Sequence, residues 1–160
     1  MPTYNPQYMG VTADYRLGLR VDRATQSGAT LFTTAAVPLF RISTGRVLVT
    51  CILGEVTTTL GADATLAKFT GTPTTGTAVD LCANSASLAN LAAAKLLVIT
   101  GTLATAMTLA NAGGALLQAT PHIIAPGTID ITGSVQGVTG AIKFSVWFIP
   151  LDEGAFIATA

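Results

Sequence analysis

The residues that could do acid–base or nucleophilic chemistry are few and scattered in this chain. His122 is the only histidine, and it lies in the apolar run TPHIIAP. Of the eight acidic residues only Asp152 and Glu153 are adjacent, and adjacent residues of a strand point to opposite faces of a sheet. No GxSxG, HExxH, P-loop or GxGxxG sequence occurs. We therefore expect no catalytic residue, metal or cofactor; a small hydrolase that uses His122 and an acid is the rival hypothesis.

The two cysteines give no sign of a redox or metal site. Cys51 and Cys82 stand alone in apolar runs and form no CxxC pair. We predict two buried free thiols, with a disulfide between them as the alternative.

The composition is poor in charge and rich in small residues. Charged residues make up 10% of the 160 residues, whereas soluble domains usually carry about 25%. Ala and Thr, with 26 each, form a third of the chain. A surface so short of charge is usually covered by copies of the protein, by a partner or by lipid. The net charge is zero, and no Lys/Arg run or nucleic-acid-binding motif is present, so we expect no nucleic-acid partner.

The longest uncharged stretch of the chain is the one candidate for a membrane-spanning segment. Residues 96–129 contain no Asp, Glu, Lys or Arg, but Gly and Pro interrupt them and no run of ~20 apolar residues occurs. We expect buried strands and loops and no membrane contact. A membrane-associated protein that uses residues 96–117 is a further rival.

The N-terminal residues 1–27 differ from the rest and are predicted to form an extended arm. They hold all three tyrosines and show no period of 2 or 3.6. Tyr and Arg are effective contact anchors, which is typical of an arm that docks on a surface; a frayed terminus is the alternative. The candidate interface residues of the arm are Tyr4, Tyr8, Tyr15, Arg16 and Arg20.

Residues 28–160 read as an all-β domain. The longest strand signal, residues 46–60, has no polar face; one face holds Val47, Val49, Cys51 and Leu53, so a central strand covered on both sides is predicted. Residues 64–71 follow a short turn, as a hairpin partner would. Residues 84–95 are the one credible helix. Seven to nine short strands predict a β-sandwich or jelly-roll-like domain with one short helix.

The strand near the C-terminus has one unusual face. Ile142, Phe144, Val146 and Phe148 form a core face, while the other face begins polar and ends with Trp147 and Ile149. We predict that Trp147 and Ile149 lie in a subunit interface. The alternative is that another element of the same chain covers Trp147.

Four segments resemble the small Ala/Thr/Gly-rich structural proteins of tailed bacteriophages. These segments are VTCILGEVTT (49–58), TPTTGTAVDLCA (72–83), IIAPGTIDI (123–131) and GAIKFSVWFIPLDEGA (140–155). The resemblance implies a decoration, or cement, protein on the surface of the phage head, with a β-rich fold and no enzymatic activity.

This resemblance, taken with the composition, sets the functional expectation. We expect a homo-oligomer, with a trimer favoured, that binds the major capsid protein and stabilises the assembled shell. The alternative is a phage tail or fibre module that binds a host-surface glycan or receptor.

Overall fold

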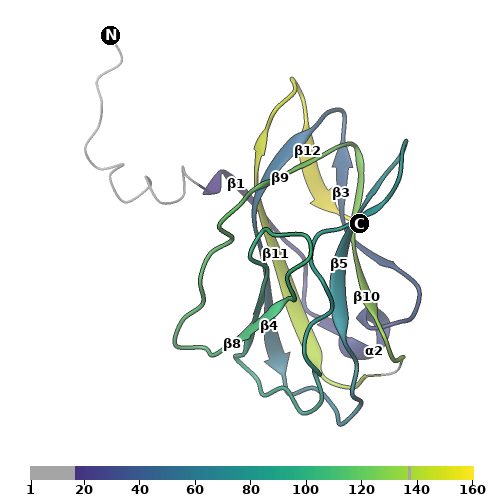
Figure 1. The fold of residues 1–160 in the computed structure, drawn as a ribbon, viewed down its shortest axis with the longest axis vertical. Coiled ribbons are helices and arrows are strands. Elements are labelled where there is room, and N and C mark those ends of the chain that lie inside the picture. The colour runs from purple at the N-terminus through teal and green to yellow at the C-terminus, as the bar shows by residue number, and fades with distance from the viewer. Residues whose placement is uncertain (1–16, 137) are drawn as a thin grey trace.

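The computed structural model describes residues 17–136 and 138–160, which form two antiparallel β-sheets packed face to face (Figure 1). This β-sandwich, nearly all-β with one short helix, confirms the predicted fold class. The helix α2 (Gly28–Leu31) is a single turn, capped by the Ser27 side chain, which accepts a hydrogen bond from the Ala29 amide.

Sheet A has seven strands and contains the longest ladder of the protein. Its main order is β1-β11-β4-β7-β8, with β2 paired to β11 and β9 paired to β4. The strands are β1 (Leu19–Asp22), β2 (Gln26–Ser27), β4 (Val47–Thr58), β7 (Leu96–Val98), β8 (Thr108–Ala110), β9 (His122–Ile124) and β11 (Ala141–Pro150).

Sheet B has five strands in the order β12-β3-β10-β5-β6. They are β3 (Val37–Ser43), β5 (Ala67–Pro73), β6 (Val79–Asp80), β10 (Gly127–Gly133) and β12 (Phe156–Thr159). The predicted hairpin between residues 46–60 and 64–71 is wrong, because β4 belongs to sheet A and β5 to sheet B.

A β-bulge in β4 decides which side chains of this strand enter the core. Trp147 pairs with Cys51, but Phe148 pairs with Val49, so Thr50 is an extra residue. The alternation of faces shifts there, which turns Val49 into the core with Ile52. The prediction of one face shared by Val47, Val49, Cys51 and Leu53 is therefore wrong. Leu48 and Leu53 point away from the core and are half-buried.

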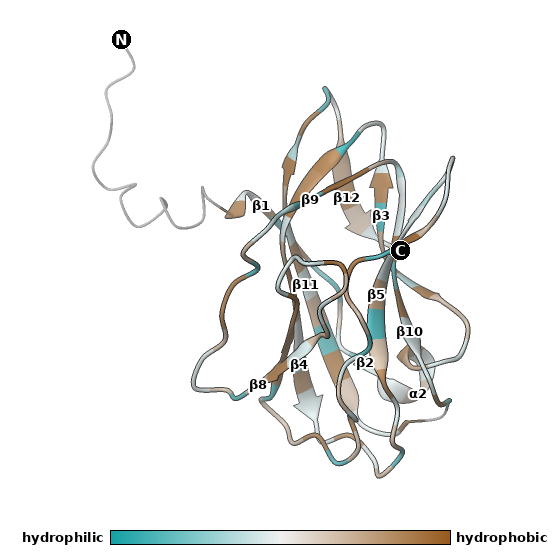
Figure 2. Cartoon of the chain, viewed as in Figure 1, coloured by the Kyte–Doolittle hydropathy of each residue, from teal (hydrophilic) through white to brown (hydrophobic). Residues whose placement is uncertain are grey.

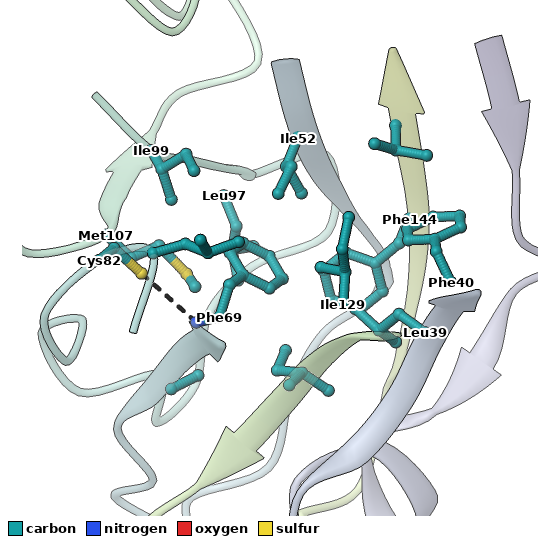
Figure 3. Packing of buried hydrophobic residues seen from close by; sticks show 14 of the residues in the cluster. Leu39, Phe40, Ile52, Phe69, Cys82, Leu97, Ile99, Met107, Ile129 and Phe144 are labelled. Atoms are coloured by element: carbon teal, nitrogen blue, oxygen red, sulfur yellow. Dashed lines mark hydrogen bonds between the residues drawn. The ribbon is translucent and has the colours of Figure 1, made fainter. Parts of the chain in front are cut away.

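The two sheets meet through aromatic side chains at the middle of the sandwich (Figure 3). The Phe69 ring of β5 meets the Phe144 ring of β11 edge to face, with centroids 5.7 Å apart and planes at 84°. Phe144 lies over Gly54, its cross-strand partner, where an added Cβ would come 2.7 Å from the ring. The Phe69 amide donates to Cys82 Sγ at 3.4 Å, so Cys82 sits in the core as a free thiol.

The helix predicted over residues 84–95 is not formed. Asn90 and Ala94 have positive φ angles of 55° and 66°, which an α-helix does not allow. The backbone of this segment bonds instead to residues 60–65: the Leu88 amide donates to Thr65 O at 2.9 Å, and the Asn90 amide donates to Gly61 O at 2.8 Å. Leu88 is fully buried, so the apolar spacing read as one helix face belongs to an irregular segment that covers the core.

The predicted boundary between an arm (1–27) and the domain (28–160) is also corrected. Strands β1 and β2 pair with β11 along residues 145–148 and 141–142, so residues from Leu19 onward are part of sheet A. Residues 1–16 of the predicted arm lie outside the described residues.

Arg23, just after β1, ties the two sheets together. The residue is 9% exposed, and its Nη1 donates to the carbonyls of Pro38, Leu39 and Ala160 at 2.8, 2.6 and 3.0 Å. Ile129 pairs with Phe40 and Asp130 with Pro38, so Leu39 is an extra residue in β3. A bulge leaves carbonyls out of the ladder, and Arg23 supplies their donor.

Arg23→Met should therefore destabilise the fold strongly. Three carbonyls would lose a charged donor inside the sandwich, and we expect a loss of about 3 kcal/mol in the free energy of unfolding. Urea denaturation measures it. Arg41→Met, at an exposed position of β3, is the matched control and should change stability by no more than about 0.5 kcal/mol. Equal effects of the two substitutions would contradict the role given to Arg23.

Candidate interaction surface on sheet A

The outer face of sheet A carries a row of apolar side chains that the core does not use. Ile149 of β11 pairs with Leu48 of β4, and Leu48 pairs with Ile123 of β9. Ile149 and Leu48 are half-buried, and Ile123 is 67% exposed. We call these three residues the outer row. Directly opposed side chains on one face of a sheet lie about 5 Å apart, so the outer row is continuous across three strands.

The connection between β8 and β9, which leads into Ile123, adds further exposed apolar side chains. Leu116 is 88% exposed and Leu117 is 62% exposed. In Figure 1 this connection bows away from the sheets, and in Figure 2 apolar colouring appears both on β9 and within the connection. The outer row, Leu116, Leu117 and the neighbouring Trp147 and Arg20 are called the sheet A surface below.

Gln118, which directly follows the two exposed leucines, joins the β8–β9 connection to sheet A through side-chain hydrogen bonds. Its Nε2 donates to Thr120 O at 2.8 Å and more weakly to Val49 O at 3.4 Å, and the residue is 8% exposed. Burial raises the pKa of the thiol of Cys51, two residues after Val49 in β4. Leu116 and Leu117 are therefore carried by an anchored segment.

Trp147 lies on the outer face and is partly covered by its own chain. It is half-buried, and the guanidinium carbon of its cross-strand partner Arg20 lies 4.9 Å from the ring centroid. This is a cation–π contact. The structure thus places Arg20, Trp147 and Ile149, three of the predicted interface residues, on one face. Tyr4, Tyr8, Tyr15 and Arg16 lie outside the described residues.

A polar pair holds Arg20 over the indole. Asp22 Oδ1 accepts from Arg20 Nε at 2.8 Å and from the Ser145 hydroxyl at 2.5 Å. The Ser145 hydrogen bond, followed by the Arg20 hydrogen bond and charge, keeps the pKa of Asp22 below its usual value of 3.8 although partial burial acts against it. Asp22 is therefore ionised at neutral pH and keeps Arg20 in its stacked position.

His122, the one histidine, lies in β9 and does not belong to the outer row. It precedes Ile123 in β9 but pairs with Val49, so it faces the opposite side of the sheet. Its Nε2 is buried and has no hydrogen-bond partner among the described residues. A His–acid pair of the kind that the hydrolase hypothesis requires is thus not made at this nitrogen.

The described part of the chain also holds no group of three His, Cys, Asp or Glu side chains placed to bind a metal ion. Within the same residues, no helix is both long and apolar enough to span a membrane. Both cysteines are buried free thiols, as predicted.

Comparison with models of known protein families, with curated proteins and with solved structures finds no match for this chain.

The sequence does not predict that Leu48, Ile123, Leu116 and Leu117 lie at the surface. Leu48 belongs to a strand that is predicted to be covered on both sides, since neither of its faces is polar. The bulge at Thr50 leaves no mark in this apolar pattern. Ile123 and the two leucines lie in the run ALLQATPHIIAPG, whose apolarity indicates burial equally well.

Trp147→Ala should cost much less stability than truncation of Phe144, a core residue of the same strand. Trp147 is half-buried on the outer face, and we expect a loss of about 1–2 kcal/mol. Phe144→Ala should cost about 3–5 kcal/mol, because it empties the contact between the sheets. Urea denaturation followed by circular dichroism compares them. Equal large losses would place Trp147 in the core.

His122 should make stability fall on mild acidification. Burial lowers the pKa of His122 below the usual 6.5. Between the two pKa values, His122 is therefore protonated in the unfolded chain but neutral in the folded protein. Stability is then lost as the pH falls below about 6.5 and levels off below the folded pKa. His122→Gln should remove most of the difference between urea midpoints at about pH 7.5 and about pH 5. An unchanged difference would show that His122 titrates normally in the fold.

Proposed function

We propose that this protein is a structural component of a bacteriophage virion. It acts as a decoration protein that binds the outside of the assembled head through the sheet A surface and catalyses no reaction. The observation that carries the proposal is the sheet A surface itself, an exposed apolar area that continues from β11 across β4 to β9. Apolar surfaces of this kind are typical of protein–protein contact sites.

The chemistry of the chain supports an assembly role over a catalytic one. Charged residues are scarce, and the sheet A surface combines aliphatic side chains with one Trp and one Arg. Trp and Arg are enriched among the residues that dominate binding energy, and apolar neighbours around them exclude water. The resemblance of four segments to small phage structural proteins supports a capsid protein as the partner.

The mechanism is stabilisation by mass action. A protein that binds the assembled shell, and not its separated subunits, shifts the equilibrium toward the shell. The major capsid protein is the partner, and homo-oligomers, with a trimer favoured, would let several sheet A surfaces bind one shell together. The place of action is the surface of the phage head.

The tail-module alternative gains less support from this geometry. A sugar ring would have to stack on an indole face, and Arg20 already occupies one face of Trp147 at 4.9 Å. Arg20 is itself held by Asp22, so a glycan would have to break a hydrogen-bonded ion pair to replace it.

Binding to capsids tests the proposal. The protein is mixed with shells assembled from the major capsid protein encoded in the same genome, and co-sedimentation gives the occupancy. Leu117→Asp and Ile123→Asp should each weaken binding by about tenfold or more, because a charge would enter an apolar contact. Light scattering of the free protein should report a trimer.

Phe156→Asp is the matched control for these substitutions. Phe156 is 47% exposed and belongs to sheet B, so its replacement should leave capsid binding unchanged. All three variants should keep the thermal transition of the parent. A parent protein that does not sediment with shells but binds purified phage tails or host glycans would overturn the proposal in favour of the alternative.

A further inference from the structure

The His122 ring places a polar atom in the interior for which the described residues supply no partner. His122 pairs with Val49, a core residue of β4, so its imidazole lies on the core face of sheet A. Its Nε2 is buried and makes no hydrogen bond within the described part of the chain. Such an imidazole is tolerated while it is neutral, because protonation would bury a charge without a counter-charge.

The strands around the imidazole turn their charged side chains away from it. On β4, Cys51 and Glu55 follow the bulge and lie on the outer face of sheet A. Across the core, three charged side chains of sheet B lie on its outer face: Lys68, Asp80 and Asp130. Cys82 lies on the core side, but burial raises its pKa, so that thiol is neutral. Burial is accordingly the cause that lowers the pKa of the imidazole.

The connection that leads from β8 to His122 is attached to the sandwich at few points. Between residues 112 and 121, two backbone amides donate to other parts of the described chain. These are Ala119 and Thr120, which both bond to Thr100 O, at 2.9 and 3.4 Å. The Gln118 side chain adds its bond to β4. Segments with so few contacts open locally at a lower free energy than global unfolding requires.

Both ends of this segment are held in place. Asn111 Oδ1 accepts a hydrogen bond from Lys95 Nζ, and Ile124 is 6% exposed and belongs to the core. Strand β9 itself has one neighbour in the sheet, β4. Residues 112–123, called the flap below, can therefore swing away from sheet A between two fixed ends.

We propose that proton uptake by His122 in mild acid favours release of the flap from sheet A while the rest of the sandwich stays folded. The open flap exposes the imidazole, whose usual pKa is 6.5, so the closed form loses stability as the pH falls below about 6.5. Leu116, Leu117 and Ile123 belong to the flap. The release does not depend on the proposed function; where both hold, a capsid bound to the sheet A surface keeps the flap closed and opposes the proton.

Amide hydrogen exchange of the free, full-length protein tests the release without capsids. NMR gives protection factors at about pH 7.5 and about pH 5.5, corrected for the intrinsic pH dependence of exchange. Protection of Ala119 and Thr120 should fall about threefold or more in acid, with about tenfold as the ceiling, because an exposed histidine is about 90% protonated at the lower pH. Low urea should leave this exchange unchanged. It should speed exchange of the Leu81 amide, which donates to Phe69 O of β5.

Two variants separate the role of the proton from the role of the anchor. His122→Gln should remove the pH effect on Ala119 and Thr120, because glutamine is neutral at both pH values. Gln118→Ala is the matched control: it should lower the protection of both amides at both pH values and leave the pH effect in place, because it weakens the attachment and keeps the histidine.

The ring resonances of His122 in the parent protein give a reading that needs no variant. Burial predicts that they titrate with a midpoint below about pH 6.5. A parent without the pH effect, a folded His122→Gln protein that keeps it, or an ordinary His122 midpoint would overturn the proposal. Equal urea dependence of the Ala119 and Leu81 amides would do so too, because exchange would then require global unfolding.

Discussion

One extra residue in β4 determines how this sandwich divides its side chains between core and surface. The bulge at Thr50, opposite Trp147 and Phe148, reverses the alternation of the strand. Val47 and Val49 consequently enter the core, and Leu48 joins Ile149 and Ile123 on the outer face. The same bulge presents the Thr50 hydroxyl to Leu17 and so fixes the point at which the N-terminal segment meets the sheet. The sheet A surface and the entry of the chain thus share one structural cause.

A second bulge, in β3, leaves backbone carbonyls that accept hydrogen bonds from an arginine next to the other sheet. Arg23 crosses from the end of β1 to the carbonyls of Pro38 and Leu39 and to the last residue of the chain, Ala160. A buried arginine with fixed partners holds the edges of both sheets in one arrangement. These hydrogen bonds link the two sheets in addition to the packing of the core.

Strand content was predictable from sequence, and side-chain placement was predictable only in part. The pattern of β11 gives its core face correctly, because Ile142, Phe144, Val146 and Phe148 alternate without interruption. The pattern of β4 misleads, because a bulge between two apolar faces leaves no polar residue out of place. The segment 84–95 has helical spacing, but its hydrogen bonds to residues 60–65 prevail over propensity. The alternation of β11 is enough to place Trp147 and Ile149 on the outer face. Their neighbours Leu48 and Ile123 could be found only from the strand pairing of β11, β4 and β9.

The proposed function requires the protein to bury its sheet A surface on the phage capsid. Hydroxyl-radical footprinting of the free and capsid-bound protein tests this claim directly, because it measures the solvent exposure of individual side chains. Leu116, Leu117 and Trp147 should become protected on binding, whereas the labelling of Phe156 on sheet B should not change. Protection of Phe156 with unchanged labelling of Leu116 and Leu117 would contradict it.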